Sequence, residues 1–206
     1  MNRLFSMDNI VMQTLGKICD LFLLNMIFLI CCIPVFTIGA SLSALYTVTI
    51  KIVRKKDPYI IKGFLEAFRS NFKQSTILWI FCLIMICFLG YDYQILNAQG
   101  SAYSPIRIIL ILITLILTAT LLYLFPIVSH FNCPTKTAIQ NALVLSIAHL
   151  PSTLLLFLYY GIILYLLLRF PQLLGPATLI GMFCGFSLSA LITSTLFSHI
   201  FQKYEP

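Results

Sequence analysis

Five stretches of this chain, each 18 residues or longer, contain no charged side chain: 21–50, 74–91, 108–135, 137–168 and 170–202. A helix needs about 20 apolar residues to cross the hydrocarbon core of a bilayer. Across the whole chain only 9% of residues are charged and 60% are hydrophobic, whereas a soluble domain carries roughly 25% charged residues. The uncharged stretches therefore predict an integral membrane protein, and the charge content argues against a water-soluble domain.

The composition of these stretches favours helices over a membrane β-barrel. Residues 108–113 and 154–158 are apolar at every position, whereas a barrel strand alternates apolar and polar side chains. We predict an all-α, polytopic membrane helix bundle formed as a single domain over 1–206, with about five transmembrane helices. The expected spans are 18–38, 75–95, 105–128, 152–169 and 178–200.

Prolines explain why some uncharged stretches are longer than one crossing requires. Pro34 can kink or end the first helix, which leaves 37–51 as a second helical piece. Pro151 separates a short helix at about 137–149 from the span that follows. The bundle is therefore expected to include short interfacial helices on the cytoplasmic side.

Basic residues predict the orientation of the bundle. Seven of the 13 lysines and arginines lie in the loop 51–74, and short loops rich in these residues stay in the cytoplasm. Five crossings then place the C-terminus inside and the N-terminus outside. The alternative is that 18–50 forms a re-entrant hairpin of two half-helices, which leaves four spans and places the N-terminus inside.

The segment 59–74 has the pattern of a two-faced helix. Its apolar side chains and its charged side chains each recur at helical spacing, on separate faces. One interpretation is a docking surface for a cytoplasmic partner or for anionic lipid. The other is an interfacial helix and a cluster of topology determinants that join two spans. The candidate docking residues are Lys51, Arg54, Lys55, Lys56, Lys62, Arg69 and Lys73.

Small residues recur at helical spacing in the last span, at Gly181, Gly185 and Ser189. Such residues let helices approach closely in lipid. They are candidates for packing within the chain or against a second copy, which leaves a homo-oligomer open.

Two parts of the chain share an order of features, which is a possible two-fold internal repeat. In both 18–95 and 105–169, a span is followed by a proline, a short helix, a Ser-Thr pair and another span. Internal repeats of this kind occur in transporters.

Catalytic and ligand-binding motifs are absent from the sequence. No phosphate-binding loop, nucleophile elbow or zinc-ligand spacing is present, and the six acidic residues are spread along the chain. We therefore expect no enzymatic activity, no cofactor and no metal site. The net charge of +7 is accounted for largely by the cytoplasmic loop, so we expect the bilayer, and not nucleic acid, as a partner.

Residues 33–40, 44–46 and 71–74, together with Lys51, Arg54 and Phe68, resemble the YesL family, also called domain of unknown function 624. The later stretches 124–126, 141–143 and 149–151 are also similar to that family. The resemblance implies a multi-pass protein of the bacterial cell membrane. Genes of the family often lie beside those for sugar ABC transporters, sensor kinases and glycan-degrading enzymes.

This genomic context implies an accessory role in carbohydrate uptake or sensing, with ABC transporter subunits or a sensor kinase as partners. The resemblance assigns no biochemical activity and no catalytic residues. The alternatives are a transporter subunit that itself carries a solute and an oligomeric membrane scaffold.

Overall fold

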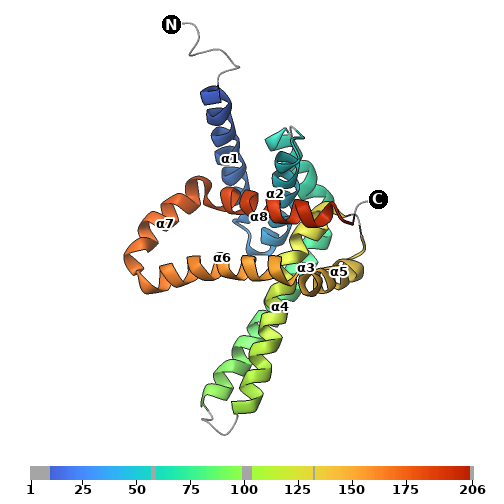
Figure 1. Cartoon of the computed structure of the whole chain (residues 1–206), viewed down its shortest axis with the longest axis vertical. Helices are drawn as coiled ribbons and strands as arrows, with labels where there is room; N and C mark the ends of the chain where they lie inside the picture. Colours follow the sequence, from blue (N-terminus) through green and yellow to red (C-terminus); the bar gives the residue numbers. More distant parts are fainter. Residues whose placement is uncertain (1–9, 57–58, 99–103, 132, 205–206) are drawn as a thin grey trace, which may run out of the picture.

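The computed structural model describes residues 10–56, 59–98, 104–131 and 133–204, and every regular element in these ranges is helical. The termini and parts of the two loops 51–74 and 92–104 lie outside the described residues. Figure 1 shows the order of the helices along the chain. They are α1 (Ile10–Cys32), η1 (Val35–Thr37), α2 (Ile38–Val53), α3 (Ile60–Ala98), α4 (Ser104–His130), α5 (Thr135–Ala148), α6 (Leu150–Arg169), η3 (Pro171–Leu173), α7 (Leu174–Ile180), the π-helical η4 (Gly181–Gly185) and α8 (Phe186–Phe201).

The first two helices form a hairpin around Pro34. Proline cannot continue the hydrogen-bond ladder of α1, and the Thr37 hydroxyl donates to the carbonyls of Cys31 and Pro34, both at 2.6 Å. The bond to Cys31 satisfies a carbonyl left over at the end of α1. In Figure 1 the start of α1 and the end of α2 lie toward the same end of the molecule.

Among the described residues, six helical segments are long and apolar enough to cross a membrane, one more than the sequence analysis predicted. The difference arises in the first uncharged stretch. The prediction treated 18–38 as one span followed by a helical piece, whereas Pro34 and η1 divide the stretch into two complete helices, α1 and α2.

Helix α2 is the centre of the bundle and contacts α1, α3, α4 and α8. Ten of the 16 residues of α2 are buried, compared with two of the 20 residues of α6. Small side chains permit this burial. A Cβ at Gly39 would lie 2.5 Å from the backbone oxygen of Ser75 and 2.6 Å from the Cβ of Trp79, so only glycine allows α2 and α3 to approach this closely.

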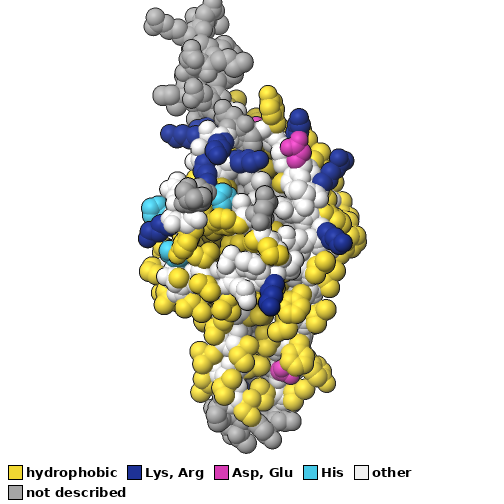
Figure 2. Space-filling view, turned by 90° about the vertical axis from the view of Figure 1, so that its right-hand side faces the viewer, with side chains coloured by type: hydrophobic (Ala, Val, Ile, Leu, Met, Phe, Trp, Pro, Cys, Tyr) yellow, Lys and Arg dark blue, Asp and Glu magenta, His cyan; other side chains and the backbone are white. Residues whose placement is uncertain are grey.

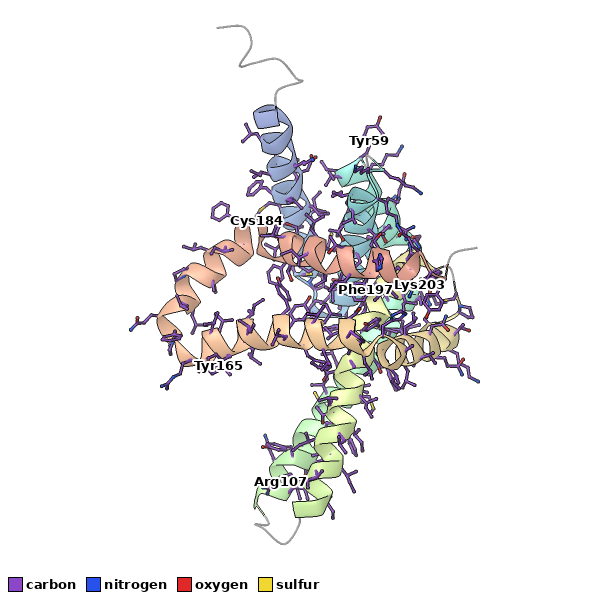
Figure 3. The ribbon with its side chains drawn as sticks, viewed as in Figure 1. Tyr59, Arg107, Tyr165, Cys184, Phe197 and Lys203 are labelled. Atoms are coloured by element: carbon purple, nitrogen blue, oxygen red, sulfur yellow. The ribbon has the colours of Figure 1, made fainter. Side chains whose placement is uncertain are left out.

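Aromatic side chains fill the space between α2, α4 and α8. The rings of Tyr123 and Phe197 meet edge to face with centroids 5.1 Å apart, and Tyr46 meets Phe197 in the same way at 5.9 Å. Figure 3 shows Phe197 in the middle of the molecule, whereas Tyr59 and Arg107 lie toward opposite ends of its long axis.

Helix α3 is continuous through the point where a break was expected. The sequence analysis placed an interfacial helix at 59–74 and a separate span at 75–95, but one helix of 39 residues covers both. At about 1.5 Å per residue its length is roughly 58 Å, nearly twice the hydrocarbon thickness of about 30 Å. Ser75 and Thr76 do not interrupt it, because Ser75 is buried and donates its hydroxyl to Ser43 of α2.

The remaining helices form two extensions from this centre. In Figure 1, α3 and α4 run together toward one end of the molecule, and α6 runs across the view toward the turn at η3, from which α7 and α8 return. Most side chains of α6 are exposed and apolar. Such a surface is compatible with lipid and would be unfavourable in water.

The two parts compared as a repeat are built differently. Residues 71–78 lie inside the single helix α3, whereas residues 148–155 contain the junction between α5 and α6. The short helix α5 does agree with the helix expected at about 137–149.

Candidate functional site

The seven basic residues proposed from sequence lie on the end of α2, the α2–α3 junction and the first turns of α3. We call this set the basic surface. Six of its members are exposed, and Arg54 is half-buried, with its Nε donating to the Ser198 hydroxyl of α8 at 3.3 Å. In Figure 2 most of the visible basic side chains lie in the upper part of the coloured surface, and hydrophobic side chains cover most of its lower part.

The first turns of α3 use only part of their apolar face for packing within the chain. Phe64 is fully buried and Phe68 is half-buried, whereas Ile61 and Leu65 remain exposed. On the charged face, Lys62 and Glu66 lie 4.0 Å apart as an exposed i,i+4 pair, which stabilises a helix by only a few tenths of a kcal/mol. Apolar and basic side chains are therefore both accessible on this part of α3.

Hydroxyl groups join α2 to α8 inside the bundle. The hydroxyls of Thr49 and Ser194 share a hydrogen bond at 2.7 Å, and those of Tyr46 and Thr193 share one at 3.3 Å. All four residues are buried. Because lipid cannot replace these bonds, they favour one packing arrangement of the two helices.

Other side chains of α2 and α3 extend this polar network to the neighbouring segments. Thr47 donates to the backbone of Ser129 on α4 at 3.2 Å. Gln74 donates to the carbonyl of Cys133 at 2.9 Å, and the indole of Trp79 donates to the carbonyl of Val35 at 2.9 Å. The sequence analysis did not identify the hydroxyl network, although Ser and Thr at spacings of three and four on α2 and α8 are a usable signal.

Asn25 bonds the irregular part of the last helical segment. Its amide nitrogen donates to the carbonyls of Gly181 at 2.9 Å and Met182 at 2.7 Å, and its amide oxygen accepts from the backbone N–H of Ser187 at 3.1 Å. The change from α- to π-helical geometry over η4 alters the regular hydrogen-bond ladder, and Asn25 supplies partners from α1. Asn25 therefore joins α1 to the last helical segment.

The three small residues proposed for helix packing are half-buried. Gly181 and Gly185 lie in η4, which packs against α1. A Cβ at Gly185 would lie 3.1 Å from the carbonyl oxygen of Ile180. The fully buried face of α8 is displaced from Ser189 and is formed by Ser187, Ala190, Thr193, Ser194, Phe197, Ser198, Ile200 and Phe201.

A cavity of about 490 Å³ lies between α1, the α2–α3 junction and α8. Lys17 of α1 and Lys55 of the junction both line it, together with Asp20. The first turns of α1 and the basic surface therefore lie beside one another.

The described residues do not form a metal site, because no three His, Cys, Asp or Glu side chains among them lie close enough together. The described cysteines are all unpaired in disulfides. At the α4–α5 junction, burial raises the pKa of the Cys133 thiol, which lowers its reactivity.

Six long apolar helices, hydroxyl bonds between them and a basic end together define a polytopic helical membrane protein. A family model described as "Protein of unknown function, DUF624" matches residues 21–93, which cover the second half of α1, all of α2 and most of α3. Over these residues, about a third of its length, the chain is similar to the DUF624 family.

One relative comes from Bacillus subtilis (strain 168). This chain is 23% identical over 150 residues to the protein described there as "Uncharacterized protein YteU". The aligned part covers 72% of this chain and 68% of the relative. No solved structure matches the chain.

Proposed function

We propose that this chain is a non-catalytic cell-membrane protein that assists a carbohydrate uptake or sensing system, and that it binds its partner through the basic surface. The observation that carries the docking part is the first third of α3, where exposed lysines and an arginine lie beside exposed apolar side chains. This segment is the beginning of α3, a helix of 39 residues that is longer than one crossing of a bilayer requires. The carbohydrate part rests on the family resemblance.

The orientation that fits this proposal places both termini in the cytoplasm. An even number of crossings brings the two ends of a chain to the same side, and the positive-inside rule assigns the basic surface to the cytoplasm. The shared cavity of Lys17 and Lys55 supports this choice over an N-terminus outside. It shares the N-terminus inside with the alternative of a re-entrant hairpin over 18–50, but α1 and α2 are complete helices and not the two half-helices of that four-span alternative.

Labelling of single introduced cysteines in a cysteine-free background tests the orientation. We expect Lys17→Cys and Tyr59→Cys to react with a membrane-impermeant maleimide only after the cells are permeabilised. Tyr165→Cys, near the other end of α6, should already react in intact cells. Reaction of Lys17→Cys in intact cells, with Tyr59→Cys protected, would place α1 the other way round.

Charge reversal on α3 tests the docking surface. The variant combines Lys62→Glu, Arg69→Glu and Lys73→Glu, and the control is Lys136→Glu with Lys203→Glu, which lie on other elements. The protein is purified from native membranes in mild detergent, from cells grown with and without plant-type glycans, and its companions are identified by mass spectrometry.

We expect a sugar ABC permease or a sensor kinase to co-purify in stoichiometric amount with the wild type and the control. Its recovery, and sugar-dependent growth, should fall with the α3 variant at equal protein level. Recovery of this chain alone under both growth conditions would refute the accessory role, and undiminished recovery with the variant would refute docking on α3.

A second candidate function is that the chain itself carries a solute. The π-helical interruption at η4 and the buried hydroxyls around α2 favour it, since transporters use interrupted helices and polar groups in the bundle core. Uptake of a labelled oligosaccharide into liposomes that contain only this protein would support this candidate over the accessory role.

A further inference from the structure

We propose that the cavity between α1, the α2–α3 junction and α8 binds the headgroup of an anionic glycerophospholipid. The proposal rests on the cytoplasmic placement of this end of the molecule, but not on partner docking. The cavity volume of about 490 Å³ falls within the range of small-molecule sites.

The charged side chains that line the cavity favour a ligand with a negative charge. Lys17 and Lys55 contribute two ammonium groups, and Asp20 contributes one carboxylate. The net charge of the lining is therefore positive, which favours a headgroup that carries one negative charge. A phosphate between the two lysines would leave Asp20 to accept a hydrogen bond from a headgroup hydroxyl, as the glycerol of phosphatidylglycerol offers.

The walls of the cavity favour a lipid over a soluble phosphate. They are formed by Leu21, Ile52, Ile60 and Leu191, which are all partly buried. Beside them on α1, Ile18 and Phe22 are exposed. Acyl chains leaving the cavity would meet this apolar surface, whereas a soluble anion would gain nothing from it.

The backbone at the cavity is shaped to present one of the lysines. Lys55 has a φ of 54°, a left-handed conformation that is uncommon for a residue with a side chain. Its N–H donates to the carbonyl of Ile52 at 3.0 Å, which ends α2 in a tight turn. Lys55 in this turn lines the cavity together with Lys17 of α1.

Native mass spectrometry of the full chain in detergent tests the proposal. The protein is titrated separately with phosphatidylglycerol, phosphatidylethanolamine and phosphatidylcholine of matched acyl chains. The test variant is Lys17→Gln with Lys55→Gln. The matched control is Lys62→Gln with Lys73→Gln, which removes the same charge from α3 outside the cavity. Equal thermal unfolding temperatures of the two variants verify that both are folded.

We expect phosphatidylglycerol to bind more tightly than the two zwitterionic lipids. Each cavity lysine removed should weaken its binding about fivefold, and the control should retain wild-type binding. Glycerol 3-phosphate at millimolar concentration should not displace the lipid. Equal binding of all three lipids, an equal loss in the control, or full displacement by glycerol 3-phosphate would each overturn the proposal. Lipid binding retained by the variant with Lys62→Glu, Arg69→Glu and Lys73→Glu, none of which lines the cavity, separates this site from docking on α3.

Discussion

Replacement of Asn25 by leucine should destabilise the bundle strongly, because leucine has a similar branched shape but no hydrogen-bonding groups. Asn25 is fully buried and makes three bonds, to the backbones of Gly181, Met182 and Ser187. A side-chain bond between membrane helices contributes about 0.6 kcal/mol on average and up to about 1.7 kcal/mol. Two carbonyls and one N–H would also be left without these partners in an apolar environment. We expect a loss of about 2–4 kcal/mol.

The assay is equilibrium unfolding by sodium dodecyl sulfate in mixed micelles. Circular dichroism reports the helices, and fluorescence of Trp79, the single tryptophan of the chain, reports the α2–α3 contact. The matched control is Thr114→Val on α4, because Thr114 is exposed and its hydroxyl donates to Leu110 of its own helix at 2.8 Å. The control should change stability by less than about 0.5 kcal/mol.

If Asn25→Leu unfolds at the same detergent fraction as the control, the bonds of Asn25 do not stabilise the last helical segment, and the reasoning is refuted. A separate outcome would show whether the π-helical geometry of η4 depends on Asn25. If the variant is stable and η4 becomes regular α-helix, the π-helical geometry depends on Asn25 and is not intrinsic to the sequence of the segment.

Two further predictions use the same unfolding assay. Gly39→Ala should cost about 1–3 kcal/mol, the range for overpacked sites, because the new Cβ meets a backbone oxygen of α3 at 2.5 Å; Gly90→Ala, where nothing lies within 4 Å, should not destabilise. Thr49→Val should lower the free energy of unfolding by about 0.6 kcal/mol. The double change with Ser194→Ala should lower it by less than the sum of the two single changes, because each single change removes the same hydrogen bond. Destabilisation by Gly90→Ala equal to that by Gly39→Ala, or strict additivity of the Thr49 and Ser194 changes, would contradict these predictions.

The sequence was sufficient for the class of fold, because uncharged stretches of this length leave helices in a bilayer as the physical solution. It was not sufficient for the number of helices. Pro34 predicts a break whether a short helical piece or a complete spanning helix follows it. Which of the two forms depends on the helices that pack against the segment. The small and hydroxyl-bearing residues of α2 are unfavourable toward lipid but suit the centre of a bundle, where α3, α4 and α8 cover them.

The candidate site shows the same division between local and long-range information. Helical spacing on 59–74 was enough to predict which basic side chains share a face, because residues three and four apart meet on one helix. It could not show that this helix continues to Ala98. The cavity with Lys17 and the bonds of Asn25 join residues far apart in the chain, so no local pattern contains them.

The uninterrupted course of α3 has a mechanical consequence. A helix of roughly 58 Å without an internal proline behaves as a stiff rod, and a tilt of about 5° around one end moves the other by about 5 Å. The basic surface is at the first end of this rod, and the turn into α4 follows the second. A force applied by a bound protein on one side of the bilayer would therefore be transmitted as a displacement on the other side.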